Sequence, residues 1–213
     1  MGPAGRNSSD WKGRFLFVGN QLALDFLNTR PVQNGEPVEL LPDFDALLRW
    51  FQAAELLGSR QVRRLQHQWE GSARAQRIVV SLRKLREGLR KDVLAWERGG
   101  ELRQGTVEEL NRLMADHPLG ARLMASGRSF SLEPRFEAHQ LEDLFAPLAY
   151  SAAALFAKVN HQRVRKCDQC VLHFHDISKR GTRRWCSMQL CGNRRKVAAY
   201  LARQRVHTEA STR

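Results

Sequence analysis

The chain contains 213 residues and carries a formal net charge of +13, a length that can bury one hydrophobic core and a small appended module. Its most apolar run, residues 144–159, is interrupted by Pro147 and Lys158 and is shorter than the roughly 20 residues of a membrane span, so we expect no membrane partner. The polar, glycine-rich start does not have the pattern of a signal peptide. We therefore expect a cytoplasmic protein whose thiols stay reduced.

The first part of the chain is expected to be helical. Residues 1–12 have no hydrophobic periodicity and are expected to be disordered, and residues 13–160 are expected to form one helical domain. A short extended piece broken at Gly19 leads into a helix that ends at Leu27. Asp43 is predicted to cap the next helix, whose apolar stripe stops at a glycine.

Two longer helices follow in the predicted domain, over residues 59–69 and 73–96. In the second of these, aliphatic residues recur on one face. The charged residues between them, including Arg86 and Arg90, are expected to face water.

Three further elements complete the predicted domain. Thr106–Glu109 matches a capping box that opens a short helix. A small hairpin is predicted around Gly127, and a last long helix over residues 137–160 leads directly to the first cysteine. The predicted fold of this domain is therefore mainly α with a small β hairpin.

All four cysteines fall in one pattern: Cys167-x2-Cys170, a gap of fifteen residues, then Cys186-x4-Cys191. Two close pairs of thiols separated by such a loop can surround one metal ion, and a tetrahedral set of thiolates suits Zn2+. Four unrelated thiols, disulfide pairs, or the replacement of one thiol by His173 or His175 are alternatives. We predict a zinc site formed by the four cysteines.

The predicted finger covers residues 161–207 and is followed by a flexible tail, residues 208–213. Large apolar residues of its loop are expected to pack over the metal, whose binding energy becomes folding energy in so small a module: Leu172, Phe174 and Trp185. Asp176 is expected to bond to the segment that contains Arg183. Asn193 is predicted to cap the final basic helix.

The positive charge is concentrated at the same end. From Lys158 to Arg213 there are fourteen basic and three acidic residues, a net of +11, whereas the rest of the chain has a net of +2. This favours a polyanionic partner over a merely solvated basic face, and the scarcity of aromatic residues favours DNA over RNA. A small finger usually needs a second copy for specificity, so a homodimer is expected. The predicted DNA contacts are Arg183, Arg184, Arg194, Arg195, Lys196 and Arg203.

Polar residues near the N-terminus are candidates for binding a small-molecule effector: Asn20, Asp25, Asn28 and Thr29. Asp25 and Asn28 are three residues apart on one predicted helix and could face a pocket together. The alternative is that these side chains cap helices and satisfy buried backbone groups.

Two other functions are compatible with the cysteines. A zinc-assisted nuclease or hydrolase could use His173, His175 and Asn193, but a catalytic zinc needs an open coordination position that four thiolates would close. A redox sensor could release zinc when its thiolates are oxidised. The second is compatible with DNA binding.

The sequence from Trp185 to Lys196, with Cys-Gly-Asn-Arg at residues 191–194, resembles the CGNR zinc finger, and the similarity extends back to the first cysteine pair. Residues 22–29, Leu-Ala-Leu-Asp-Phe-Leu-Asn-Thr, are similar to the opening motif of the ABATE domain, which usually precedes that finger. The resemblance implies a bacterial regulator with a helical sensing domain, a DNA-binding finger and the four cysteines as zinc ligands. The loop of residues 175–182 departs from the commonest family pattern.

Overall fold

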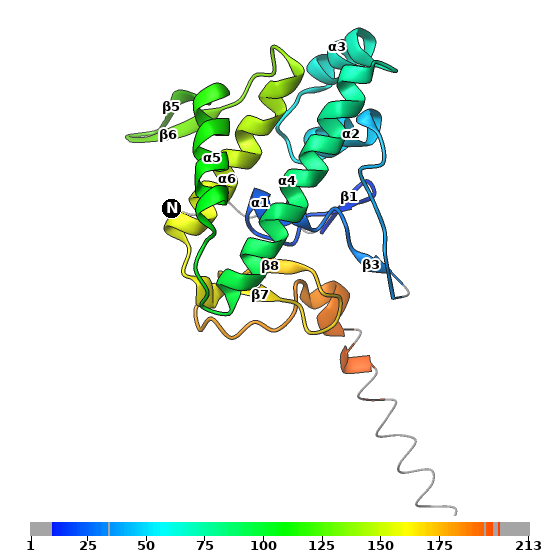
Figure 1. The fold of residues 1–213 in the computed structure, drawn as a ribbon. Coiled ribbons are helices and arrows are strands. Elements are labelled where there is room, and N and C mark those ends of the chain that lie inside the picture. The colour runs from blue at the N-terminus through cyan, green and yellow to red at the C-terminus, as the bar shows by residue number, and fades with distance from the viewer. Residues whose placement is uncertain (1–9, 34, 194, 198–199, 201–213) are drawn as a thin grey trace, which may run out of the picture.

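The computed structural model describes residues 10–33, 35–193, 195–197 and 200, and its described part is dominated by helices (Figure 1). Short 3-10 turns flank the last α-helix, and one π-helical turn lies near the C-terminus. The α-helices are α1 (Leu22–Leu27), α2 (Phe44–Ala53), α3 (Ser59–Trp69), α4 (Ala73–Glu97), α5 (Gln104–Asp116) and α6 (Phe145–Lys158). The turns are η1 (Leu141–Leu144), η2 (His161–Arg163) and η3 (Met188–Gly192). Over the described ranges, no helix is both long enough and apolar enough to cross a membrane.

The strands of the described residues form separate antiparallel pairs. They are β1 (Trp11–Lys12) with β2 (Phe15–Leu16), β3 (Val32–Gln33) with β4 (Glu36–Pro37), β5 (Gly120–Ser126) with β6 (Ser129–Arg135), and β7 (Val164–Lys166) with β8 (His173–His175). The prediction of a mainly α fold is confirmed, as is the hairpin around Gly127. Of the expected disordered start, residues 1–9 lie outside the described part, whereas residues 11–12 form β1.

The longest helix, α4, stands beside α5 and α6 along the length of the body (Figure 1). The short helix α1 packs against α4 and α6 on one side and against strand β8 on the other. In the same view, α3 lies at the end of the body opposite to β7 and β8. The segment that carries the cysteines therefore lies next to α1 rather than on a separate stalk.

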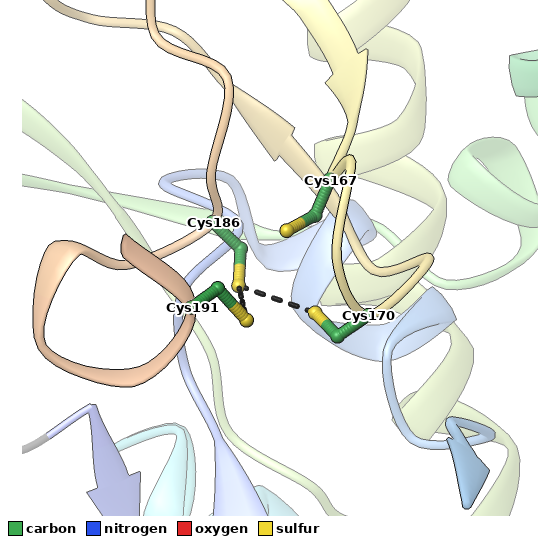
Figure 2. A group of neighbouring side chains, drawn as sticks. All are labelled: Cys167, Cys170, Cys186 and Cys191. Atoms are coloured by element: carbon green, nitrogen blue, oxygen red, sulfur yellow. Dashed lines mark hydrogen bonds between the residues drawn. The ribbon is translucent and has the colours of Figure 1, made fainter. Parts of the chain in front are cut away.

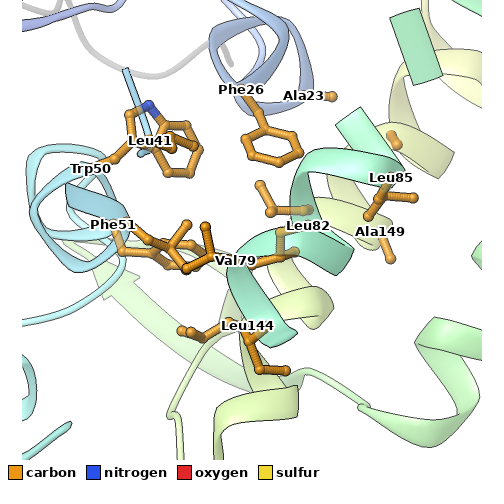
Figure 3. Packing of buried hydrophobic residues seen from close by; sticks show 14 of the residues in the cluster. Ala23, Phe26, Leu41, Trp50, Phe51, Val79, Leu82, Leu85, Leu144 and Ala149 are labelled. Atoms are coloured by element: carbon orange, nitrogen blue, oxygen red, sulfur yellow. The ribbon is translucent and has the colours of Figure 1, made fainter. Parts of the chain in front are cut away.

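Trp50 of α2 is fully buried in the core and lies within an aromatic cluster. The rings of Phe17, Phe26 and Phe51 lie 6.1, 5.5 and 5.4 Å from its ring, measured between centroids. Figure 3 shows aliphatic residues of α4, among them Leu82, on the facing side of this cluster. Each large side chain buried here contributes roughly 1.5–3 kcal/mol, which holds α1 firmly in the body.

Helix boundaries followed local chemistry in some places and tertiary contacts in others. Asp43 caps α2 as predicted, because its carboxylate accepts a hydrogen bond from the Ala46 amide at 2.7 Å. The capping box at Thr106 was wrong: α5 already begins at Gln104. The Thr106 hydroxyl donates to the buried carboxylate of Asp92 at 2.7 Å, so it does not cap the helix.

The last long helix begins later than predicted. Asp143 accepts hydrogen bonds from the amides of His139 and Gln140 at 2.8 and 2.9 Å, which produces a 3-10 turn before α6. Helix α6 then starts at Phe145, with Pro147 in its first turn, where a missing amide hydrogen costs no helical hydrogen bond.

The expectation that Arg86 and Arg90 face water was wrong. Arg86 is only 1% exposed and donates to the Thr29 hydroxyl at 2.8 Å and to the carboxylate of Glu39. Arg90 donates to the Leu27 carbonyl of α1. Burial by itself opposes the charge on Glu39, yet hydrogen bonds from Arg86 and from a backbone amide lower its pKa. The polar side of α4 is thus a second, charged interface inside the domain.

Replacing Arg86 by methionine is expected to lower the free energy of unfolding by about 2 to 3 kcal/mol, because it leaves two carboxylates without their buried partner. The loss stays below that of a fully buried pair, since the side chains of Glu39 and Glu87 are 28% and 33% exposed. Urea denaturation measures the change. Arg77→Met, on the exposed side of α4, is the matched control and should change stability by less than about 0.5 kcal/mol; equal losses would contradict the assignment.

Candidate metal centre

The four cysteines converge from two segments of the C-terminal region, and their sulfur atoms face one another (Figure 2). Cys167 directly follows β7, and Cys170 lies in the turn before β8. Cys186 precedes the η3 turn, which contains Cys191. All four sulfurs lie within 4.8 Å of one another, with 3.4 Å between those of Cys170 and Cys186 and 3.7 Å between those of Cys186 and Cys191.

These separations fit a tetrahedral thiolate site. A Zn–S bond of about 2.3 Å places the corners of a regular tetrahedron roughly 3.8 Å apart. The cysteines are free thiols, with sulfurs much farther apart than a disulfide bond of about 2.05 Å, so the disulfide alternative is not supported.

The protonation of the four thiols shows why the cluster needs a cation. Hydrogen bonds from Cys170 and then Cys186 lower the pKa of Cys167, which allows one thiolate to form. The pKa of Cys170 is raised to about 12, chiefly by its hydrogen bond to Cys167, and the pKa values of Cys186 and Cys191 are raised as well. Several negative sulfurs cannot coexist here without a positive ion, and a divalent metal supplies that charge.

Local backbone geometry holds both cysteine pairs in place. In the first turn the Cys167 amide donates to the Leu172 carbonyl at 2.8 Å, and Val171 has a φ of +59°, an unusual value for a β-branched residue. In the second, the side chain of Ser187 caps η3 by accepting a hydrogen bond from Leu190. The predicted capping role of Asn193 was therefore wrong, since Asn193 is already helical.

A small hydrophobic cluster covers the thiols. Leu172 and Phe174 are buried in it and Trp185 packs against it, as predicted. The sequence interpretation missed that the N-terminal region also contributes, with Val18 buried in the cluster and Leu16 beside it. The finger therefore completes its core with residues that lie about 150 positions earlier in the chain.

The loop between the cysteine pairs is fastened by charged residues. Asp176 accepts hydrogen bonds from the amides of Ser178 and Arg183 at 2.9 Å each, which confirms its predicted bond to this segment. The guanidinium of Arg163 donates to the Ser178 carbonyl at 2.7 Å and lies against Gly181. Gly181 has a φ of +64°, which favours glycine, and an added Cβ would lie 2.6 Å from that guanidinium and displace it.

The predicted DNA contacts differ in how freely they can act. Arg183 donates to the backbone carbonyls of Trp185 and Cys186, and its guanidinium lies 4.8 Å from the Phe174 ring, so it supports the finger. Arg184 pairs with Asp168 at 2.8 Å and remains 57% exposed. Arg195 and Lys196 are exposed on the helical segment after η3. Arg194 and Arg203 lie outside the described residues.

Two exposed cations were not among those predictions. Lys179 and Arg180 lie in the loop between the two cysteine pairs, and both side chains are exposed. They belong to the stretch that departs from the commonest finger pattern. Their position in a loop between two cysteine pairs was the available signal.

His173 is buried rather than available for catalysis. It is 2% exposed, and neither ring nitrogen has a hydrogen-bond partner among the described residues. Burial lowers its pKa to about 4, with a smaller contribution from the positive charges of Arg90 and Lys166. Glu97 lies 3.9 Å from the ring, too far to offset these effects. A buried, neutral imidazole does not support the nuclease alternative.

The four effector candidates near the N-terminus bond to the protein itself. Asp25 accepts the Gly19 amide at 2.7 Å, and the Thr29 hydroxyl donates to the Phe26 carbonyl and accepts from Arg86. Asn20 and Asn28 reach across to the finger, where both side chains hydrogen-bond to the backbone of strand β8.

Comparison with known families gives two matches along the chain. The ABATE domain, described as "Putative stress-induced transcription regulator", matches residues 20–159, and the CGNR zinc finger matches residues 163–204. No curated protein matches the chain. With the finger match and the sulfur geometry together, the four cysteines are positioned to bind one zinc ion.

The depressed pKa of His173 predicts a pH effect on stability. The ordinary pKa of about 6.5 applies in the unfolded chain, so between pH 6.5 and about 4 the unfolded state binds the extra proton. The free energy of unfolding should therefore fall as the pH drops through this range, by up to about 3 kcal/mol. His173→Leu should lose this part of the pH dependence.

Denaturation of the wild-type and His173→Leu proteins at several pH values gives the free energy of unfolding of each. Protonation of the cysteines affects both proteins alike, so it cancels in the difference between the two profiles. His67→Leu, at an exposed position of α3, is the control and should keep the wild-type profile. Parallel profiles for the His173→Leu and wild-type proteins would contradict the assignment.

Proposed function

Because the chain belongs to the ABATE family and ends in a CGNR zinc finger, we propose that it is a zinc-dependent regulator of transcription that binds DNA through this finger. The observation that carries the proposal is a set of exposed cations on a frame that the metal organises. Lys179 and Arg180 come from the loop between the cysteine pairs, and Arg195 and Lys196 follow the second pair. Because the backbone of the loop is held by bonds such as those to Asp176, these exposed side chains can meet phosphates without the loop first being ordered.

A hollow beside the cysteines supports the same surface. It has a volume of about 480 Å3 and lies where β7 meets the segment before the second cysteine pair. Its lining combines four cations with a threonine and two carboxylates: Arg165, Lys166, Arg183, Arg184, Thr182, Glu97 and Asp168. A predominantly cationic hollow attracts phosphate oxygens, and the carboxylates of Glu97 and Asp168 hold the backbone of Lys166 and the side chain of Arg184 in place.

DNA affinity should depend strongly on salt. If four to six phosphates are contacted, the logarithm of the association constant should fall against the logarithm of salt concentration with a slope of about −4 to −5. The double variant Lys179→Gln, Arg180→Gln should reduce the magnitude of this slope by about 2, because about one phosphate contact is lost with each cation that is removed. Fluorescence anisotropy with a labelled duplex between 50 and 200 mM salt measures both.

The matched control removes two exposed arginines of α3, Arg60→Gln and Arg63→Gln, at the opposite end of the body, and should leave the slope unchanged. Chelation of zinc should abolish binding. A flat salt response, or binding that survives loss of the metal, would overturn the proposal.

The proposal includes a homodimer formed through β5 and β6. Cross-strand pairs place six apolar residues of this hairpin on one face: Ala121, Leu123, Ala125, Phe130, Leu132 and Pro134. Met124, opposite Ser131, lies on the other face. Leu123, Phe130 and Leu132 are 66%, 69% and 71% exposed. A two-stranded hairpin with one uncovered apolar face is only marginally stable alone.

A second copy of the chain suits this face. Figure 1 shows the hairpin in the half of the molecule away from β7 and β8, so two copies can meet there while their basic fingers stay apart. Among the described residues, the outer edge of β5 has no strand partner and no proline, whereas β6 carries Pro134. Two fingers on one assembly would extend the DNA sequence that is read.

Leu132→Glu is expected to convert the dimer into a monomer, because it places a charge in the apolar contact. Light scattering after size-exclusion chromatography should give twice the 24.4 kDa chain mass for the wild type and a single chain mass for the variant. Ser129→Glu, on the polar face of the same strand, should remain dimeric. A monomeric wild type would refute this part of the proposal.

The domain limits of this proposal are residues 13–160 for sensing and 161–207 for the finger. An open pocket of about 260 Å3 between α5 and α6 is lined mostly by apolar residues, including Leu110 and Phe156, with Asn111 as its polar member. It supports a small, mainly apolar effector better than α1, whose candidate side chains already bond to protein. A redox response is compatible with the same site, since Cys170 is the partly exposed one of the four thiols.

A further inference from the structure

We propose that Asn20 and Asn28 are positioning residues: their side chains fix strand β8 of the zinc finger in one position relative to helix α1. The finger and the N-terminal domain thereby stabilise each other. The finger is then not an independent module on a linker. The second strand of the finger, β8, is hydrogen-bonded along its outer edge to α1 and to the turn before it. These bonds set the orientation of the exposed cations of the finger.

The contacts form a short ladder. The His175 amide donates to the Gly19 carbonyl at 2.8 Å, and the Asn20 side chain donates to the His175 carbonyl at 2.9 Å. Two residues further back on β8, the Asn28 side chain donates to the His173 carbonyl and accepts from the His173 amide, both at 2.9 Å. The Asn28 amide group thus pairs with β8 in the way that a neighbouring strand would.

Burial makes this pairing specific. Asn28 is 3% exposed and His173 is 2% exposed. Without the amide of Asn28, the backbone N–H and C=O of His173 would both be buried without a partner, and such groups are costly. A shift of β8 by one residue would break all four bonds of the ladder. The ladder therefore selects one register.

Helix α1 is also tied to the body on its other side. The Ala23 amide donates to the Ser151 hydroxyl of α6 at 2.9 Å, and the Leu27 carbonyl accepts from Arg90 of α4. The turn before α1 is equally constrained, because an added Cβ at Gly19 would lie 2.9 Å from atoms of Leu24 and Asp25. A rearrangement of α4 or α6 would therefore move β8 along with α1.

A second attachment prevents rotation about α1. The Lys166 amide of β7 donates to the carboxylate of Glu97, at the end of α4, at 2.8 Å. Val18 and Leu16 add apolar contact with the cluster over the thiols. Together with the ladder, these contacts fix both strands of the finger hairpin to the N-terminal domain.

Coupling between two sites is reciprocal. If docking of the finger orders α1, then zinc binding must protect α1, and anything that stabilises α1 must favour the docked finger. This requires no DNA, so the inference can be tested even if the proposed function is wrong.

The test is hydrogen exchange of the full-length protein with zinc bound and after chelation. Removal of zinc should speed exchange of the α1 amides, residues 23–27, by more than tenfold, while amides of α3 at the far end change less than threefold. The α3 amides separate a local effect on α1 from a general loss of stability.

Two variants test the asparagines directly. In Asn28→Ala, the exchange of α1 should already be fast with zinc bound, and chelation should change it less than threefold, although one zinc per chain is retained. Asn20→Gly keeps the backbone, whose φ is +56°, and removes only the amide; it should lose part of the protection even if Asn28→Ala fails to fold. Gln76→Ala, which removes an exposed side-chain amide on α4, is the control and should match the wild type.

Two results would overturn the inference. The first is a wild-type α1 whose exchange does not respond to zinc. The second is full zinc-linked protection of α1 in Asn20→Gly and in any folded Asn28→Ala protein. A loss of DNA binding with intact protection would count against the proposed function alone.

Discussion

The C-terminal region depends on one electrostatic constraint: four sulfur atoms lie within 4.8 Å of one another in a largely buried place. Without a cation, only one of them is readily ionised, and the pKa values of the other three are raised. A zinc ion removes this conflict and joins two turns that have little apolar material of their own. The loop between them, with its exposed Lys179 and Arg180, inherits its shape from the metal and from the bonds of Arg163 and Asp176.

The metal does not act alone, because the finger shares its core and its strand pairing with the N-terminal domain. Val18 closes the cluster over the thiols, and Asn28 supplies a strand-like partner for β8. On the other side of α1, the buried Arg86 and the partly buried Arg90 join α4 to the same helix and its flanking turn. A short helix of six residues thereby lies between the two parts of the protein that carry sensing and recognition in our proposal.

Features that depend on local spacing could be predicted from the residues. The cysteine pattern identified the metal centre, Asp43 identified the start of α2, and glycine at residue 127 identified a hairpin. The errors have a common origin. Thr106 and Asn193 have side chains suited to capping, but the Thr106 hydroxyl bonds to Asp92, and Asn193 has helical backbone angles directly after the η3 turn that Ser187 caps. A polar side chain that could either cap a helix or bond elsewhere adopts the role for which the tertiary structure supplies a partner.

The sequence by itself determined the mainly α fold, the four zinc ligands and the concentration of positive charge, because each rests on periodicity, spacing or composition along the chain. Only the tertiary structure decided that Asn20 and Asn28 bond to the finger, that Arg86 is buried, and that Arg183 bonds to the backbone of the finger. These outcomes depend on partners far away in sequence, such as His173 for Asn28. The direction and strength of a hydrogen bond depend on where its partner lies in space, and the residues adjacent in sequence do not determine that position.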